Sequence, residues 1–162
     1  MVEAVLIWLE RSALGEFMRT SSLWVYPVVN LLHIFGIAAL FGGAAIIDLR
    51  LLGLWRRTPL AAISEATVPV SAAGFALAAT TGVALLVTKS TEYIGNPFLL
   101  IKFGAIFVAL INVAILNRSP AWRARRDREL EPHERRRLAV FGGVSLAAWM
   151  TAVAAGRMIA YW

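Results

Sequence analysis

The stretch "NLLHIFGIAALFGGAAIIDLR", residues 30–50, decides the fold. It is almost entirely aliphatic or aromatic, with one histidine, His33, near its start and with Asp48 and Arg50 at its end. The whole chain of 162 residues is 59% hydrophobic and 16% charged, and its mean hydropathy is +0.70. A water-soluble domain has about 45–50% apolar and about 25% charged residues. We therefore expect lipid, rather than water, around most of this chain.

Four stretches are apolar and long enough to cross about 30 Å of hydrocarbon as helices, at 1.5 Å per residue. They cover residues 23–47, 67–88, 97–116 and 138–161. Tyrosines and tryptophans stand near their ends, as is typical of membrane interfaces. The sequence predicts an all-α integral membrane four-helix bundle, and 162 residues make this a single transmembrane domain.

Residues 1–20 precede the first span and show the apolar period of an amphipathic helix. We expect this helix to lie along the outer membrane interface. The alternative is a cleaved signal peptide, but Glu3 and Glu10 interrupt its apolar core and no basic segment precedes it. The segment "TPLAAISEA", residues 58–66, suggests a second short surface helix. In the helix predicted over residues 1–20, the apolar positions are Val2, Val5, Leu6, Leu9, Ala13 and Phe17.

Most of the 16 Lys and Arg residues lie in two connections between the spans. The positive-inside rule places such connections in the cytoplasm. We therefore expect an inner-membrane protein with both termini on the periplasmic side, and a basic cytoplasmic loop over residues 117–137 that contacts anionic lipid head groups. In a chain this apolar, the net charge of +6 indicates topology rather than nucleic-acid binding. The arginines concerned are Arg50, Arg56, Arg57, Arg118, Arg123, Arg125, Arg126, Arg128, Arg135, Arg136 and Arg137.

Three ionisable side chains, those of His33, Lys102 and Arg157, lie inside predicted spans, all in the outer half. An ionisable group in hydrocarbon costs about 2.5–3.5 kcal/mol on insertion scales, so each needs a reason. We predict that the three meet in one pocket that attracts an anion. The alternatives are an interhelical hydrogen bond for the histidine and snorkelling to the head groups for the two cations.

Neighbours of His33 complete this predicted site. Tyr26 and Asn30 share its helix face through the i, i+3, i+4, i+7 spacing, and Gly36 would leave room for a bulky group. Met150 lies on the last span at a similar depth to His33, where its thioether is either a haem ligand or ordinary packing.

Other polar or small residues in the spans have structural interpretations. Asp48 and Arg50 would cap the first span and pair there or with neighbouring loops. Asn112 is expected to mediate helix packing, as are the small-residue pairs Ala78/Gly82 and Ala152/Gly156. The chain contains no cysteine, which excludes disulfides, thiolate zinc sites and iron–sulfur clusters.

Three segments resemble an uncharacterised family of small bacterial multi-span membrane proteins. They are "YPVVNLLHIFGIAALFGGAAIIDLRLLGL" from Tyr26, "NPFLLIKFGAIFVALINVAILN" from Asn96 and "AAGRMIAYW" at the C-terminus. More distantly, a histidine in the first span and a lysine early in a later span are similar to the HemJ-type protoporphyrinogen oxidases and the CopD-type copper-resistance proteins. The HemJ resemblance implies haem b, with His33 as an axial ligand and Lys102 at the haem site. The flanking motifs differ from those of HemJ, and the outer methionine- and histidine-rich sites of copper handlers are absent, so neither catalysis nor copper transport is inferred.

These observations leave three functional hypotheses. The first is a haem-binding membrane protein for redox chemistry or sensing, with His33 on the iron and with Lys102 and Arg157 neutralising propionates. The second is a non-catalytic structural or assembly subunit that packs against a second copy or another membrane protein. The third is an anion channel or small transporter lined by the same residues. No phosphate loop, paired catalytic carboxylates or nucleophile triad indicates an enzyme.

Overall fold

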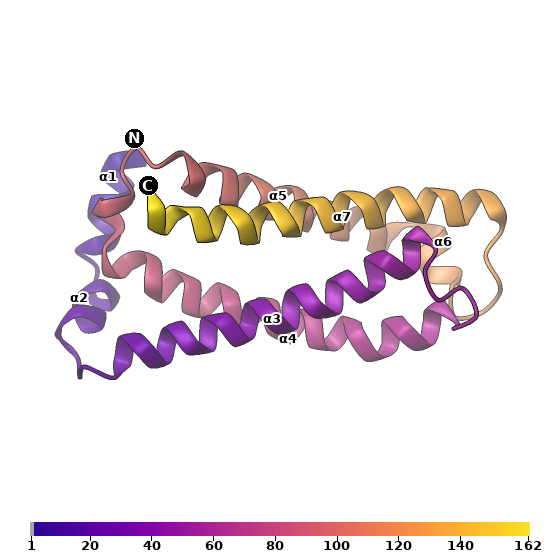
Figure 1. Ribbon diagram of the computed structural model, residues 1–162, viewed down its shortest axis with the longest axis horizontal. Helices are drawn as coiled ribbons and strands as arrows, with labels where there is room; N and C mark the ends of the chain where they lie inside the picture. The colour runs from indigo at the N-terminus through magenta and orange to yellow at the C-terminus, as the bar shows by residue number, and fades with distance from the viewer. Residues whose placement is uncertain (1) are drawn as a thin grey trace.

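The computed structural model describes residues 2–162, and this part of the chain is helical, without a strand. Four helices are long and apolar enough to cross a membrane (Figure 1). The predicted all-α membrane four-helix bundle is confirmed, and the chain is a multi-pass membrane protein. The four helices are α3 (Val25–Leu52), α4 (Leu60–Thr88), α5 (Pro97–Arg118) and α7 (Pro132–Met158).

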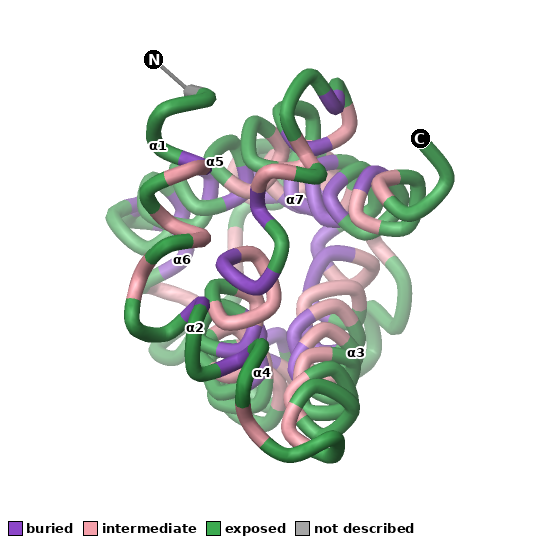
Figure 2. The backbone as a smooth tube through the Cα atoms, turned by 90° about the vertical axis from the view of Figure 1, so that its left-hand side faces the viewer, coloured by how far each residue is buried: buried purple, intermediate pink, exposed green. Residues whose placement is uncertain are grey.

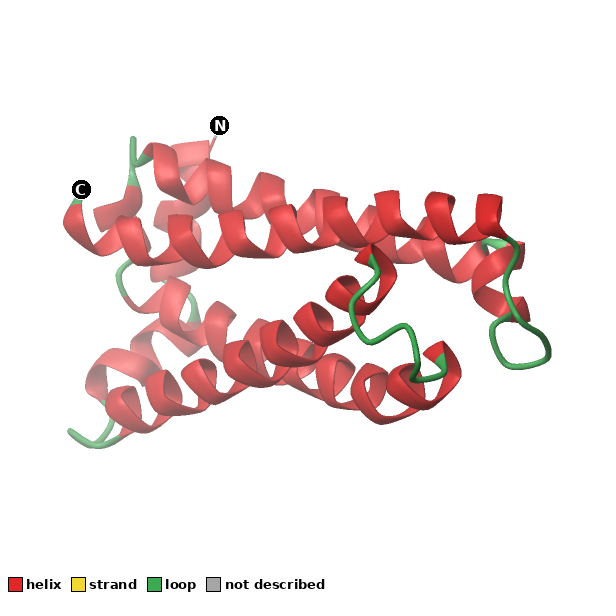
Figure 3. Ribbon diagram, turned by 45° about the vertical axis from the view of Figure 1, so that its right-hand side comes forward, coloured by secondary structure: helices red, strands yellow, loops and turns green. Residues whose placement is uncertain are grey.

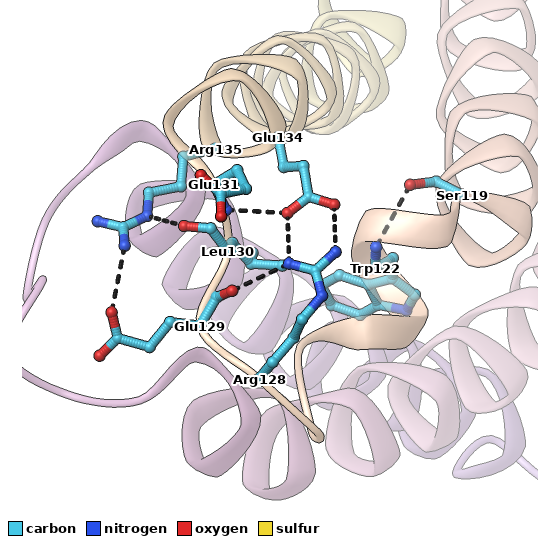
Figure 4. Close-up of polar contacts among 8 residues, drawn as sticks. All are labelled: Ser119, Trp122, Arg128, Glu129, Leu130, Glu131, Glu134 and Arg135. Atoms are coloured by element: carbon cyan, nitrogen blue, oxygen red, sulfur yellow. Dashed lines mark hydrogen bonds and ion pairs between the residues drawn. The ribbon is translucent and has the colours of Figure 1, made fainter.

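The long helices extend beyond the predicted spans at the end of the bundle that carries the connections after α3 and α5, here called the loop end. Residues 60–66, expected as a separate surface helix, are the first turns of α4, and Pro69 lies inside that helix without ending it. The expected loop 117–137 contains the short helix α6 (Pro120–Ala124) and the start of α7. Ser119 caps α6 through the N–H of Trp122, and Glu134 accepts from the backbone N–H of Glu131 to begin α7 (Figure 4).

The N-terminal segment forms two short helices, α1 (Val2–Glu10) and α2 (Ala13–Thr20), instead of the single helix that was expected. Ser12 separates them, because its extended backbone and its hydroxyl, which accepts from the N–H of Gly15, make it the N-cap of α2. Both helices cross the other end of the bundle, here called the terminal end, where both chain termini lie (Figure 1).

The N-terminal helices are tied to the segment that links α4 to α5. Ser90, in the short helix η1 (Ser90–Tyr93), donates its hydroxyl to the carbonyl of Leu6 at 2.9 Å. The carboxylate of Glu10 accepts from the backbone N–H of Thr91 at 2.7 Å and from its hydroxyl at 2.6 Å. Arg19 of α2 donates to the carbonyl of Thr88 at 3.1 Å. These bonds hold α1 and α2 across the terminal end.

The four long helices form two pairs, α3 with α4 and α5 with α7, and the pairs meet mainly where α3 packs against α7. The pairs approach each other at the loop end and diverge toward the terminal end (Figures 1 and 3). Seen along the bundle, buried backbone faces inward and exposed backbone covers the outside (Figure 2). Large apolar side chains on that outside, such as Leu100 and Phe107, each 65% exposed, are suited to contact with lipid.

The α3–α4 pair is closed by direct backbone contact at its small residues. A Cβ added at Gly36 of α3 would stand 2.6 Å from the backbone nitrogen of Ala78, and one at Gly43 would collide with the hydroxyl of Ser71. The space that Gly36 was expected to leave for a ligand is therefore filled by α4. The predicted packing role of Ala78 and Gly82 is confirmed, since Gly82 lies against the ring of His33.

Candidate functional site

His33 is held between α3 and α4 near the terminal end of the bundle. Its side chain is half-buried, and its Nδ1 lies 3.1 Å from the hydroxyl oxygen of Thr81. The ring rests on Gly82, where an added Cβ would stand 2.9 Å from the ring carbon Cε1. Two consecutive residues of α4 thus fix the imidazole, one by a hydrogen bond and one by leaving room for it.

The surroundings of Thr81 define which nitrogen of His33 is free. The Thr81 hydroxyl lies 2.5 Å from the carbonyl of Leu77, one turn back, and donates its single hydrogen there. Its oxygen must then accept from Nδ1–H, which leaves a lone pair on Nε2. Within residues 2–162, Nε2 has no hydrogen-bond partner, and the only enclosed side-chain polar atom without one is Oδ2 of Asp48. Nε2 is therefore both unpaired and accessible.

Lys102 of α5 approaches the same region from the other helix pair. Its aliphatic stem and ammonium run along α7 at Gly156, where an added Cβ would stand 3.5 Å from both Cε and Nζ. Like Nε2, Nζ has no hydrogen-bond partner among the described residues and is not enclosed. The structure therefore places His33 and Lys102 toward the same end of the bundle, on different helix pairs, without a hydrogen bond between their side chains within residues 2–162.

Arg157, the third of those groups, makes a local contact instead. Its side chain is exposed and folds back along its own helix to Tyr161, four residues on. The guanidinium carbon lies 4.8 Å from the centre of the tyrosine ring, and Nη2 hydrogen-bonds the tyrosine hydroxyl. Arg157 follows Gly156 directly, so it stands beside the Lys102 stem, but its guanidinium is engaged with Tyr161.

The remaining predicted site residues are not joined to His33. Asn30 is exposed, Tyr26 is 48% exposed and Met150 is 55% exposed. Tyr26 lines a separate cavity of about 480 Å³ with Lys89 and Tyr93 near the terminal end. The partner of the imidazole is Thr81 of α4, rather than Asn30 or Tyr26 of its own helix face.

Asp48 and Arg50 do not pair with each other, but Arg50 bonds the neighbouring loop, which is the other arrangement that the sequence predicted. Asp48 is only 4% exposed, and its Oδ2 has no partner among residues 2–162. Its backbone packs on α7, where a Cβ added at Gly142 would stand 2.9 Å from the Asp48 carbonyl oxygen. Arg50 donates to the carbonyl of Thr58, in the loop after α3, at 3.0 Å. Residues two apart on a helix do not face each other, which explains the difference.

Sequence reasoning missed Thr81, although a signal for it was present. Thr81 lies between Ala78 and Gly82, the small-residue pair that the sequence assigned to helix packing. A hydroxyl on a packing face is expected to meet a polar group on the opposing helix. Only the knowledge that this face meets α3 would have connected it to His33.

A second polar region lies at the loop end. It is a cavity of about 820 Å³ lined by the end of α3, the start of α4, residues 125–130 and the start of α7. Arginine is the most frequent residue type in its lining. Burial, together with the nearby charge of Arg126, lowers the pKa of the Arg125 guanidinium, which stays charged because arginine starts so high.

Comparisons with protein-family models, with curated proteins and with solved structures found no match to this chain. Within residues 2–162, no group of three or more His, Cys, Asp or Glu side chains could hold a metal ion. The donor set at the terminal end is thus one imidazole nitrogen and one ammonium. The set at the loop end is a group of guanidinium ions.

Proposed function

We propose that this membrane protein binds haem b through Nε2 of His33. The observation that carries the proposal is the hydrogen bond from Nδ1 of His33 to Thr81. Histidines that ligate metals usually donate their other ring N–H to a fixed acceptor, which orients the ring and raises the basicity of the ligating nitrogen. Here the hydroxyl of Thr81, itself anchored on the Leu77 carbonyl, is that acceptor.

The donor set favours haem over a bare metal ion. A bound zinc ion takes three or four protein ligands, whereas the porphyrin supplies four ligands to iron and leaves one or two axial positions for the protein. A single imidazole suffices for that. Haem also carries anionic propionates, for which the accessible ammonium of Lys102 is a suitable counter-ion. The resemblance to HemJ-type proteins supports the same roles for His33 and Lys102.

One histidine per chain limits the coordination of the iron. Because Met150 is exposed, it is not the expected second ligand. The iron would keep an open position, which favours binding or oxidation of a small molecule, or it would take His33 of a second copy. When bound, haem supplies redox or ligand-binding chemistry, and this chain's residues orient it and balance its charge. We further propose that the terminal end faces the periplasm across the inner membrane, because the arginines gather at the loop end.

The absorbance spectrum of protein purified in detergent from haem-replete cells tests this proposal. We expect a Soret band that His33→Ala abolishes and that His133→Ala, which changes the only other histidine, leaves intact. Thr81→Val removes the acceptor of Nδ1–H and should weaken haem affinity about tenfold. Lys102→Met should also lower haem retention. Circular dichroism of each variant controls for folding, and a colourless wild-type protein would overturn the proposal.

A further inference from the structure

Arginine is the most frequent residue type in the lining of the cavity at the loop end. Eight arginines line it, against one aspartate and one glutamate. Three of the eight are paired with carboxylates: Arg126 with Glu65 at 3.3 Å, Arg128 with Glu134 at 2.7 Å and Arg135 with Glu129 at 3.6 Å. Figure 4 shows the last two pairs. The other five have no carboxylate partner within residues 2–162: Arg50, Arg56, Arg57, Arg125 and Arg136.

Several of the unpaired guanidinium groups are fixed in place. Nε of Arg50 donates to the carbonyl of Thr58 at 3.0 Å, and Nε of Arg56 donates to the carbonyl of Gly53 at 3.1 Å. Arg125 stacks on the ring of Trp122 at 3.8 Å and donates through Nε to Ser64 at 2.9 Å. Arg50 also donates through Nη2 to the carbonyl of Arg56, and Arg125 through Nη1 to the carbonyl of Trp122, so the other Nη donors of these groups are left for an anion. Arginines held in this way lose less conformational entropy when they bind.

The cavity also has an apolar side. Leucines from three elements line it, including Leu51 of α3, Leu60 of α4 and Leu138 of α7, which belong to the buried cluster at this end of the bundle. The cavity lies where the membrane-spanning helices end, which is the depth of lipid head groups. A small inorganic anion would need only the arginines. An amphiphile uses both the guanidinium groups and the leucines.

We propose that this arginine cavity binds an anionic phospholipid, with its phosphate on the guanidinium groups and the start of its acyl chains on the leucines. Guanidinium groups match the geometry of phosphate oxygens and hold them with paired hydrogen bonds. The site is independent of His33, which lies toward the opposite end of the bundle, so it stands whether or not haem binds.

Titration of the full-length protein in detergent with short-chain phosphatidylglycerol, followed by native mass spectrometry, tests the proposal. Short-chain phosphatidylcholine controls for the acyl chains, and inorganic phosphate controls for the anion alone. We expect phosphatidylglycerol to bind more tightly than phosphatidylcholine, and inorganic phosphate not to displace it at comparable concentrations. Equal binding of the two lipids would overturn the proposal. Displacement by inorganic phosphate would mean that the cavity holds a free anion and would overturn the lipid assignment.

Matched arginine variants separate the cavity from its general positive surroundings. Arg57 and Arg136 line the cavity, and Arg118 and Arg137 lie outside it; all four side chains are exposed. Arg57→Gln/Arg136→Gln should weaken phosphatidylglycerol binding about tenfold, whereas Arg118→Gln/Arg137→Gln, with the same change in charge, should alter it less than about twofold. An equal effect of the two double variants would overturn the proposal. These four side chains make no hydrogen bond or ion pair within residues 2–162, so folding is spared.

Discussion

The two helix pairs of the bundle close in different ways. Between α3 and α4, glycines let the backbones touch, as at Gly36 and Ala78. Between α5 and α7, side chains fill the interface: Asn112 donates its amide to the carbonyl of Phe141 at 3.0 Å, and Lys102 lies across Gly156. The α3–α4 interface depends on glycines, which have no side chain, whereas the α5–α7 interface is formed by side chains. A substitution therefore has no space to adjust in the first and some space in the second.

The same difference in packing explains why the side chain of one candidate site residue is fixed by its neighbours and that of the other is not. His33 belongs to the backbone-packed pair, and its position is fixed by Thr81 and Gly82. Lys102 belongs to the side-chain-packed pair and keeps an ammonium without a partner in the described residues. The ring is thus held in place and the ammonium is not, which would suit the proposed haem site, where the ring would fix geometry and the cation would balance charge.

The largest expected effect comes from filling the glycine contact. Gly36→Leu forces a side chain against the backbone of Ala78 and should destabilise the protein by about 3 kcal/mol. Thermal unfolding in detergent measures this. The matched control is Gly104→Leu in α5, where an added Cβ meets nothing within 4 Å. Similar losses in the two variants would show that the loss at Gly36 does not come from the contact with α4.

A smaller effect is expected at the side-chain-packed interface. Asn112 is only 6% exposed, and Asn112→Leu removes its bond to α7 while keeping the apolar bulk. We expect a loss of about 1 kcal/mol, as for other hydrogen bonds between membrane helices. The exposed Asn117, on the same helix, provides the control variant Asn117→Leu, which should be neutral. A loss at Asn112 as large as that at Gly36 would contradict the comparison.

The smallest effect concerns the contact at the terminal end between α1 and the segment that links α4 to α5. Hydrogen bonds from Thr91, supported by nearby Arg19, lower the pKa of the Glu10 carboxyl below its ordinary value of 4.5. A lowered pKa in the folded state means that the contact contributes fully above pH 4.5 and is lost as pH falls through the lowered value. Hydrogen exchange of α1 should therefore quicken under acid.

Glu10→Gln supplies the control for the acid effect. Glutamine keeps one acceptor but carries no titrating carboxyl, so exchange of α1 in this variant should be faster at neutral pH and should show little further change under acid. A variant that responds to acid as the wild type does would place the titrating group elsewhere.

Hydropathy was sufficient to predict the four spans, because lipid requires helices that are apolar along their whole length. Hydropathy underestimated the length of α4, since residues 60–66 continue the helix beyond the apolar core. The contacts of the candidate site were harder to predict. The spacing of Tyr26, Asn30 and His33 indicated a shared face but not the helix that this face meets. Helix partners depend on how small residues on two helices interlock, and a single sequence does not show that.

Local chemistry would have placed Arg157 better than the pocket hypothesis did. Tyr161 stands four residues after it, the spacing at which side chains on one helix meet. The structure shows that contact. Lys102 has no such local partner, and its stem lies across α7. For these two cations, the presence or absence of a polar partner four residues later thus indicates where the side chain makes its contact better than depth in the span does.

The bond from Thr81 to Leu77 also restricts what His33 can do with protons. A histidine that relays a proton takes it on one nitrogen and releases it from the other. The hydrogen on Nδ1 faces an oxygen whose own hydrogen is committed to a backbone carbonyl. Passing it onward would require the threonine to rotate away from that carbonyl. The imidazole is thus arranged to donate an electron pair from Nε2 alone. Each proton transfer through the ring would have to break the hydrogen bond between the Thr81 hydroxyl and the Leu77 carbonyl.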